Sequence, residues 1–282
     1  MADVLFGVTE SVATAMEIVS AEVQSYLIQE SILLPTITNF SQYAIKGAKT
    51  VEIPRAGGFT VGDKAENTIA SASTITYATD QIALSKHKYV QMLVEDIANY
   101  QATPDVTQNM LIRAAKDMAL QIDVDIIAQL MLASAAAPDH QIVFIDTVND
   151  VIAKGDFLAA RKLLRTQNVS VQETNILVGP EKEAEMLALA DFIDASKFGS
   201  AEPIQNGVIG KIYGMKVLVH SSVTDYMLVY HPSAVGFASQ WMGRYQVEKD
   251  LSMLSIRHGI DSLYGVKVLD SGKRQVLVDS TN

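Results

Sequence analysis

Apolar residues recur at helical spacing in two long stretches of the chain. The first covers residues 4–27, where apolar side chains follow one another at steps of three and four residues and would share one face of a helix. The second begins after Pro104 and ends near Ala136, which predicts a helix roughly 45 Å long at 1.5 Å per residue. Its apolar stripe consists of Leu111, Ala115, Met118, Ile122, Ile126, Leu130 and Ala133. Such a long helix is typical of a structural spine.

The first helix needs a surface that covers its apolar stripe, because short isolated helices are only marginally stable in water. Pro35 ends this helix, since proline lacks a backbone N–H and its ring clashes with the preceding turn. The sequence leaves two covers open. One is the core of the same chain, and the other is a neighbouring subunit.

Strand-like residues flank a flexible segment between residues 50 and 94. Thr50–Ile53 predicts a short strand that Pro54 stops, and residues 74–94 are rich in Thr, Ile, Tyr and Val. The segment between them, RAGGFTVGDKAENTIASAS, consists largely of glycine and small residues. We therefore expect a long two-stranded ribbon with a flexible end. Such a ribbon is marginal alone and must rest on its own domain or on a partner.

The second half of the chain alternates between strand and helix patterns and then becomes β-rich. The predicted strands are residues 141–146, 175–178, 211–220, 226–230, 264–269 and 275–278, with further alternating segments in 245–258. One helix is predicted from the capping-box-like Thr147–Asp150. Another is predicted from Pro180, where proline and acidic residues suit a first helical turn. Asp270–Lys273 is typical of a hairpin turn joining the last two strands.

The composition excludes several classes of protein. Of the 282 residues, 49% are hydrophobic and 19% are charged, which excludes a disordered chain and suggests one large domain or two closely packed ones. The chain has 22 basic and 32 acidic side chains, so its net charge is −10, the opposite of what binding to nucleic-acid phosphates requires. We expect only weak contact with DNA. The absence of cysteine excludes disulfides, thiolate zinc sites and cysteine nucleophiles.

Nothing in the sequence predicts a membrane segment or a secretory signal. The longest uncharged apolar run, Ile126–Pro138, is too short to span a bilayer. The first 17 residues carry no basic side chain, which a secretory signal needs. We expect no association with a membrane.

The glycine-rich stretch before residue 65 is the first candidate for a ligand site. Gly57 and Gly62 stand at the spacing of a phosphate-binding loop. However, Asp63 occupies the position of the required lysine, and no helical pattern follows. We interpret the stretch as a flexible loop rather than a nucleotide site.

The remaining candidates for catalysis are weak. His258 and Asp261 could supply two metal ligands, but no third ligand is in view. Ser221, His231 and Asp225 contain the residue types of a serine hydrolase, although a chain of this length contains many such triples. We therefore expect no catalytic residues, no metal site and no cofactor.

Charged residues on two predicted elements are interpreted as surface. Asp123 and Asp125 are two residues apart on a helix and point in different directions, so they form no carboxylate pair. Asp117 and Asp123 are expected to face solvent. Lys86 and Lys88 alternate with other side chains on the ribbon, where we expect a solvated or subunit-pairing face.

Three stretches, taken in order, carry a resemblance to a known family. They are VEIPRAGGFTVGDKAENT followed by LSKHKYVQMLVEDI, then NILVGPEKEAEMLAL, and then GVIGKIYGMKVLV with the later HPSAVGFA and YGVKVL. With the N-terminal helix and the spine, the chain resembles the major capsid protein of tailed bacteriophages with the HK97 fold. The resemblance covers essentially the whole chain.

The resemblance implies an α+β, HK97-like capsid fold. It divides the chain into an N-terminal arm (1–49), an extended β-hairpin loop (50–94), a peripheral domain with the long spine helix (95–140 and 243–282), and an α/β axial domain (141–242). It also implies a structural protein, not an enzyme, whose pentamers and hexamers form an icosahedral shell around phage double-stranded DNA. The expected location is the virion, after assembly in the host bacterial cytoplasm. Expected partners are other copies, a separate scaffolding protein, a portal and a decoration protein.

The extended loop is the expected contact between subunits. The residues expected there are Arg55, Gly57, Gly58, Gly62, Lys64 and Glu66. Some members of the family cross-link their subunits through a Lys–Asn isopeptide bond, and Lys64 could be the donor by position. Residues 207–281 contain no asparagine, so the usual acceptor region is empty and we predict no cross-link.

Two alternative functions stay open from the sequence. An encapsulin-like compartment shares this fold but encloses enzymes rather than DNA. A cytosolic α/β enzyme would need a convergent polar site, and no motif in the sequence indicates one.

Overall fold

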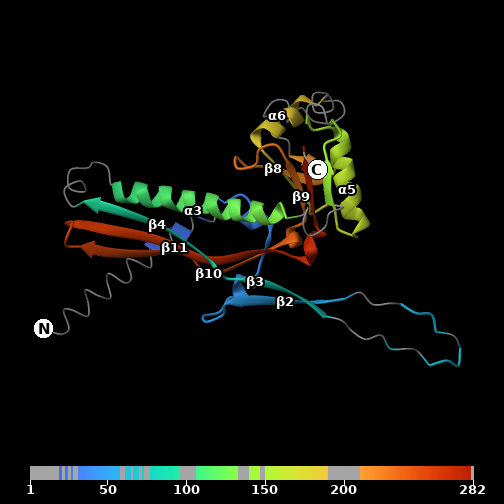
Figure 1. Cartoon of the computed structure of the whole chain (residues 1–282), viewed down its shortest axis with the longest axis horizontal. Coiled ribbons are helices and arrows are strands. Elements are labelled where there is room, and N and C mark those ends of the chain that lie inside the picture. Colours follow the sequence, from blue (N-terminus) through green and yellow to red (C-terminus); the bar gives the residue numbers. More distant parts are fainter. Residues whose placement is uncertain are drawn as a thin grey trace.

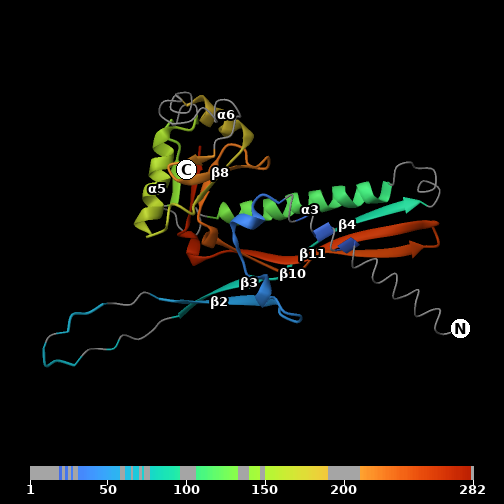
Figure 2. The ribbon, with the colours of Figure 1, turned by 180° about the vertical axis from the view of Figure 1, so that it is seen from behind.

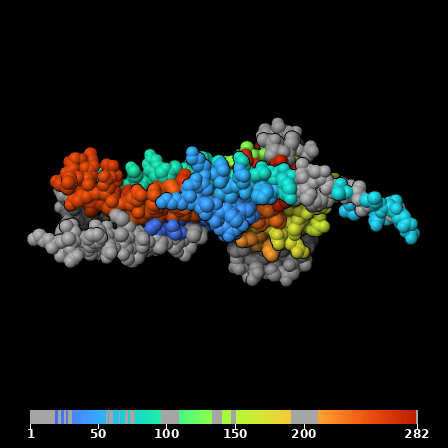
Figure 3. Space-filling model, turned by 90° about the horizontal axis from the view of Figure 1, so that it is seen from below, coloured from blue at the N-terminus to red at the C-terminus, as the bar shows by residue number. Residues whose placement is uncertain are grey.

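The subunit is elongated and flat. The computed structural model describes residues 31–57, 61–64, 66–69, 72, 77–95, 106–132, 140–146, 150–189 and 210–280, together with residues 19, 20, 23, 24 and 27. Its elements spread in the plane of Figure 1 and present a thinner profile in Figure 3. A peripheral part lies at one end, an axial part at the other, and a ribbon extends from between them.

The peripheral part is a four-stranded sheet with one long helix on its face (Figure 1). The sheet order is β1 (Thr38–Asn39), β10 (Val235–Asp250), β11 (Ser255–Val268) and β4 (Lys86–Glu95). The helix α3 (Val106–Leu130) is the predicted spine, about 37 Å long at 1.5 Å per residue. Six of its seven predicted stripe residues are buried, and Ala133 lies outside the described residues.

The described positions of the N-terminal stripe pack on the subunit's own core. Val23 and Leu27 are buried in the same hydrophobic cluster as α3, and Val19 packs against it. The Gln24 amide donates to the backbone oxygen of Met242 at 2.6 Å, which ties this segment to β10. The rest of the predicted helix lies outside the described residues, so its cover stays a prediction.

The axial part is a six-stranded mixed sheet with two helices. The sheet order is β5 (Gln141–Val143), β12 (Gln275–Asp279), β9 (Met227–Tyr230), β6 (Asn175–Val178), β8 (Met215–Val219) and β7 (Lys211–Ile212). The described helices are α5 (Lys154–Thr166) and α6 (Pro180–Ala188), and α6 starts at Pro180 as the sequence predicts. Their apolar faces and one face of the sheet form a second core, which includes Phe157, Leu164, Ile176 and Met186.

The ribbon consists of β2 (Thr50–Ala56) and β3 (Tyr77–Ala83), which pair in antiparallel register from Thr50↔Ala83 to Ala56↔Tyr77. Figure 2 shows it extending away from both sheets. Short 3-10 turns among the described residues include Leu34–Thr36, Ser41–Tyr43, Pro232–Ala234 and Asp270–Gly272.

The expected return strand of the ribbon is in fact two strands. β3 ends at Ala83, and after Leu84 and Ser85 the chain continues as β4. β4 then pairs with β11 in the peripheral sheet, from Tyr264↔Lys86 to Ser255↔Glu95. The uniform β-rich composition of residues 74–94 conceals this change of partner, because strand propensity does not specify which strand pairs with which.

Two further predictions about local structure were wrong. The strand expected over 211–220 is a tight hairpin, because Tyr213 and Gly214 both have positive φ angles and reverse the chain. The helix expected from Thr147 begins only at Lys154. Asp156 supplies its N-terminal cap by accepting from the backbone N–H of Ala153 at 2.7 Å.

The predicted hairpin at Asp270–Lys273 was also wrong. Asp270, Ser271 and Gly272 all have positive φ angles and pass the chain from one sheet to the other. β11 therefore stays in the peripheral sheet, while β12 lies between β5 and β9 in the axial sheet. The division into domains stays a prediction, and β4 and β12 both cross its expected limits.

Candidate subunit-contact surfaces

The weak catalytic candidates do not come together. The ring of His258 is buried, with its Nδ1 atom 2.6 Å from the Tyr245 hydroxyl, and burial lowers its pKa. Asp261 is three residues along the same strand, so it points to the other face of the sheet. Within the described residues there is no group of three His, Asp or Glu side chains that could hold a metal ion.

The candidate serine-hydrolase triple and the candidate phosphate-binding loop also lack the geometry of such sites. The ring nitrogens of His231 contact Ser233 at 2.8 Å and Glu173 at 3.2 Å, rather than Ser221 and Asp225. In the described part of the glycine-rich stretch, residues 57 and 61–64 contain no helix that could bind a phosphate.

Asp123 does not face solvent, which corrects the expectation for this residue. Its carboxylate is buried and accepts from the Ser31 hydroxyl at 2.6 Å and from the backbone N–H of Ile32 at 2.9 Å. The Nε2 atom of His220, in the axial part, lies 3.5 Å away. Asp123 on the spine helix α3 therefore connects two other segments to it: the segment at Ser31 and Ile32, and the axial part at His220.

Asp125 also has a structural role that the sequence analysis missed. It accepts from the Tyr264 hydroxyl at 2.6 Å, and the Nζ atoms of Lys86 and Lys88 lie 2.8 and 3.8 Å from it. Burial, the hydrogen bond to Asp125 and its negative charge raise the pKa of Tyr264. Lys86 and Lys88 thus pair with the spine of their own chain, which corrects the expectation of a solvated or subunit-pairing face.

A polar cluster lies on the opposite face of the peripheral sheet. Asp261 accepts from Arg244 at 2.8 and 3.0 Å and from the Trp241 indole N–H at 2.8 Å, and the Nε2 atom of His87 lies 2.9 Å away. Burial alone would raise the pKa of Asp261, but these hydrogen bonds and the charge of Arg244 hold it below its ordinary value. The Arg244 guanidinium also stacks over the Trp241 ring.

The predicted contact residues of the loop lie in different surroundings. Arg55 is fixed at the ribbon by ion pairs to Asp80 at 3.3 Å and to Asp270 at 2.5 Å. Farther along, Lys64 and Glu66 are exposed.

The predicted glycines belong to the same projecting segment. Gly57 and Gly62 are exposed, and a side chain at Gly62 would meet no atom within 4 Å. Gly58 lies outside the described residues. The apolar neighbours Val61 and Ile69 are 93% and 99% exposed.

A second exposed apolar site lies at the turn between β10 and β11. Leu251, Met253 and Leu254 are all more than half exposed at the far end of this long hairpin. These three residues are not among the contact residues predicted from the sequence. The available signal was a group of apolar residues in a turn-like segment, where solvent-exposed polar residues are the norm.

A flat subunit with a projecting loop and exposed apolar ends is typical of a structural protein that builds larger assemblies. A family model described as phage capsid protein matches residues 55–271. This match covers most of the chain, which therefore belongs to the phage capsid protein family. A search of the curated proteins found no similar sequence.

Solved structures show that the fold is the HK97-like capsid fold. A chain described as Mycobacterium phage Che8 is 21% identical, has a TM-score of 0.71, and aligns over 89% of this chain and 92% of its own length. The Cyanophage Pam1 capsid is 12% identical with a TM-score of 0.70, over 89% and 92%. The bacteriophage PhiM1 mature capsid is 12% identical with a TM-score of 0.70, over 88% and 86%.

None of the described helices is both long enough and apolar enough to cross a membrane.

Proposed function

We propose that this capsid protein is the major shell subunit and assembles through pentamers and hexamers into an icosahedral shell around phage double-stranded DNA. The observation that carries the proposal is the ribbon loop, which extends beyond the body of the subunit (Figure 1). Val61 and Ile69 in this loop are almost fully exposed. Apolar side chains gain free energy only when another surface removes them from water. A neighbouring copy supplies that surface.

The loop residues have two roles in this proposal. Arg55, Lys64 and Glu66 contact neighbouring subunits, Arg55 from a position already fixed by Asp80 and Asp270. One exposed ion pair contributes at most about 1 kcal/mol, but a shell repeats each pair many times.

The glycines of the loop adapt it to its neighbours. Without a Cβ atom, Gly57, Gly58 and Gly62 let the backbone follow the different curvatures that pentamers and hexamers require.

The proposal assigns the N-terminal arm to residues 1–49, the extended loop to 50–94, the peripheral domain to 95–140 and 243–282, and the axial domain to 141–242. Sheet membership refines these limits. β4 is a strand of the peripheral sheet, although it lies within the limits of the extended loop, and β12 is a strand of the axial sheet, although it lies within the limits of the peripheral domain.

The partners follow from the same proposal. A separate scaffolding protein, a portal and a decoration protein complete the particle. The net charge of −10 keeps contact with the packaged DNA weak. Residues 207–281 contain no asparagine to receive Lys64, so the shell protein of mature particles runs on denaturing gels near 30.6 kDa, without a ladder of cross-linked species.

The loop glycines give the test of this function. The double variant Gly57→Val/Gly58→Val restricts the loop backbone and removes no side chain from either core, since glycine has no side chain to remove. We expect an unchanged melting temperature and a failure to close shells by electron microscopy. Normal shells from this variant would contradict the role of the loop.

The encapsulin-like alternative is separated by what the particles contain. The match to the phage capsid protein family favours DNA as the content. Particles from infected cells are expected to hold double-stranded DNA that leaves freely at low salt. A protein cargo in place of DNA would favour the compartment, and an active site would have to be sought again only if no particles form.

A further inference from the structure

Helix α5 carries three positive side chains that no described residue of the chain neutralises. Arg161, Lys162 and Arg165 are partly or fully exposed, and in the described parts of the chain none of the three forms an ion pair. The acidic residue of this helix, Asp156, is buried and caps the helix. This face is unusual in a chain whose net charge is −10.

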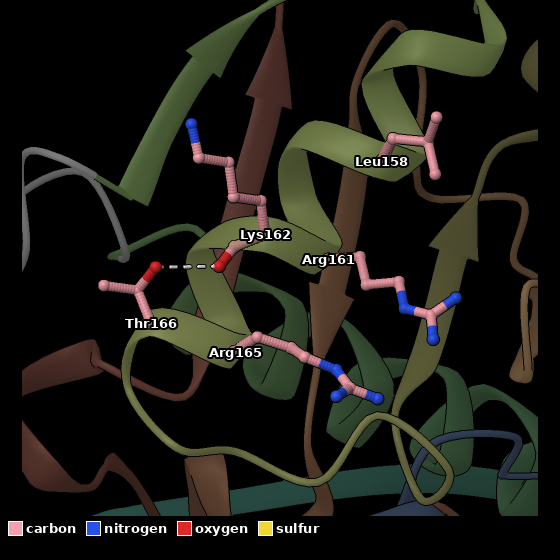
Figure 4. A pocket seen from close by; sticks show the side chains of 5 residues that line it. All are labelled: Leu158, Arg161, Lys162, Arg165 and Thr166. Carbon is pink, nitrogen blue, oxygen red and sulfur yellow. Dashed lines mark hydrogen bonds between the residues drawn. The ribbon is translucent and has the colours of Figure 1, made fainter.

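The same face includes an apolar residue and a hollow. Arg161, Lys162 and Arg165 project from one face of α5, and their side chains splay to the left and right of the helix axis (Figure 4). With Leu158 and Thr166 they line an open hollow of about 460 Å³. Leu158 is 49% exposed. An apolar centre among arginines is the composition that protein interfaces favour.

The positive surface continues at the edge of the axial sheet. Arg161 donates to the backbone oxygen of Tyr213, in the turn of the β7–β8 hairpin, at 3.2 Å. In that hairpin Lys211 and Lys216 lie directly opposite each other, and both are exposed. Like charges in this arrangement destabilise a sheet unless negative charge lies close by.

Complementary acidic side chains lie at the start of the other helix of the axial part. Glu181 and Glu183 are in the first turn of α6, where they point to different sides of the helix, and neither forms an ion pair among the described residues. Glu185 differs, because it pairs with the buried Lys182 at 3.1 Å. α6 lies at the end of the axial sheet away from α3, while α5 lies on the side toward which the ribbon extends (Figures 1 and 2).

Resting on the proposed function, we propose that the basic face of α5 binds the acidic first turn of α6 in the adjacent copy of the same capsomer, that is, of the same pentamer or hexamer. A ring of identical subunits uses head-to-tail contacts, which require two different and complementary surfaces on each copy. Both helices lie at the margin of the subunit's flat outline, where copies in a shell meet (Figure 1). A second copy of this chain therefore supplies the carboxylates that α5 lacks.

Charge reversal tests this contact. Lys162→Glu/Arg165→Glu replaces two side chains that form no hydrogen bond or ion pair with the described residues. Glu181→Lys/Glu183→Lys reverses the charge of the acidic first turn, and the quadruple variant restores opposite charges. Lys46→Glu/Lys49→Glu is the control, because it changes the net charge by the same amount at exposed positions far along the chain. Sedimentation velocity measures the formation of capsomers. The melting temperature of each variant is recorded first, because the lysines of Glu181→Lys/Glu183→Lys oppose the helix dipole at the start of α6 and could destabilise the subunit itself.

We expect each face variant to weaken capsomer association about tenfold or more, the quadruple variant to recover most of it, and the control to assemble like the wild type. Normal assembly of the α5 variant would overturn the contact and leave the proposed function standing. An equal loss of assembly in the control variant would also overturn the contact. If the α5 variant assembled normally but its particles retained less DNA, the basic face of α5 would instead be assigned to DNA phosphates. Failure of the wild type to assemble would instead remove the proposed function, and the contact with it.

Discussion

Asp123 joins three segments that are far apart in the sequence. Asp123 lies on α3. Its carboxylate accepts a hydrogen bond from Ser31, which precedes the first 3-10 turn, and lies close to His220, which follows β8. Ser222 donates its backbone N–H to the Nδ1 atom of His220 at 3.1 Å, which leaves the Nε2 atom as the one that faces the carboxylate. Each oxygen of this buried group thus has partners, which is the condition for burying a charge without a large cost in stability.

Replacing Asp123 by alanine is expected to destabilise the subunit by about 3 kcal/mol, because the Ser31 hydroxyl and the Ile32 N–H would lose their acceptor inside the protein. Urea unfolding of the dissociated subunit measures this. Asp117→Ala is the matched control on the same helix, since Asp117 is exposed and its partner among the described residues is the exposed Arg113. We expect less than about 0.5 kcal/mol for the control, and equal effects of both substitutions would contradict the role of Asp123.

Asp261 makes the folded subunit less stable as the pH falls. Its pKa is lower in the folded subunit than in the unfolded chain, so it binds protons less readily when folded. Its contribution is therefore present above the unfolded pKa of about 3.9 and lost as the pH falls through the lower, folded pKa. Asp261→Asn should cost about 2 kcal/mol at pH 7. The difference from wild type should shrink toward pH 3, whereas a constant difference would contradict the assignment.

At the scale of elements, the ribbon is held at its base by a close approach of strands. Ile82 is buried in a small cluster with Val51 and Leu84. Strand β11 passes so near the end of β3 that a Cβ atom at Gly265 would lie 2.2 Å from the backbone oxygen of Ala83. Glycine is therefore required at this position for the ribbon to rest on the sheet.

Gly265→Ala should push the base of the ribbon off the sheet and cost about 2 kcal/mol. Limited proteolysis should then cut the ribbon faster than in the wild type. Gly259→Ala provides the control on the same strand, because its Cβ atom would meet nothing closer than 3.8 Å. If both variants resist proteolysis like the wild type, the close approach does not hold the ribbon.

The elements that could be predicted from the sequence are those with a strong local signal. The spine stripe from Leu111 to Leu130 repeats at helical spacing, and Pro180 marks the start of α6, so both were predicted correctly. Strand partners carry no comparable local signal. β12 pairs with β9, and β4 pairs with β11, through contacts between residues far apart in the sequence.

The polar residues were harder to predict for a related reason. Asp123 and Asp125 flank the apolar stripe of α3, and the hydroxyls that donate to them, those of Ser31 and Tyr264, are 92 and 139 residues away. A charged side chain is usually exposed, so solvent was the default expectation. Their position beside buried residues of the stripe was the one available warning.

At the scale of the whole molecule, the two hydrophobic cores account for the body but not for its extensions. α3, the peripheral sheet and part of the axial sheet share one core, and α5 and α6 cover the other. The loop beyond β2 and the β10–β11 turn project from this body and expose Val61, Ile69 and Leu251 (Figure 1). An isolated monomer would leave these apolar groups in water, whereas a shell would cover them.

Sedimentation velocity of the purified wild-type protein, with negative-stain electron microscopy of the same sample, tests the central claim most directly. The account predicts closed shells, open sheets or isolated capsomers. A compact monomer that stays monomeric even when a scaffolding protein is supplied would contradict it, because the exposed loop would then have no neighbour to contact.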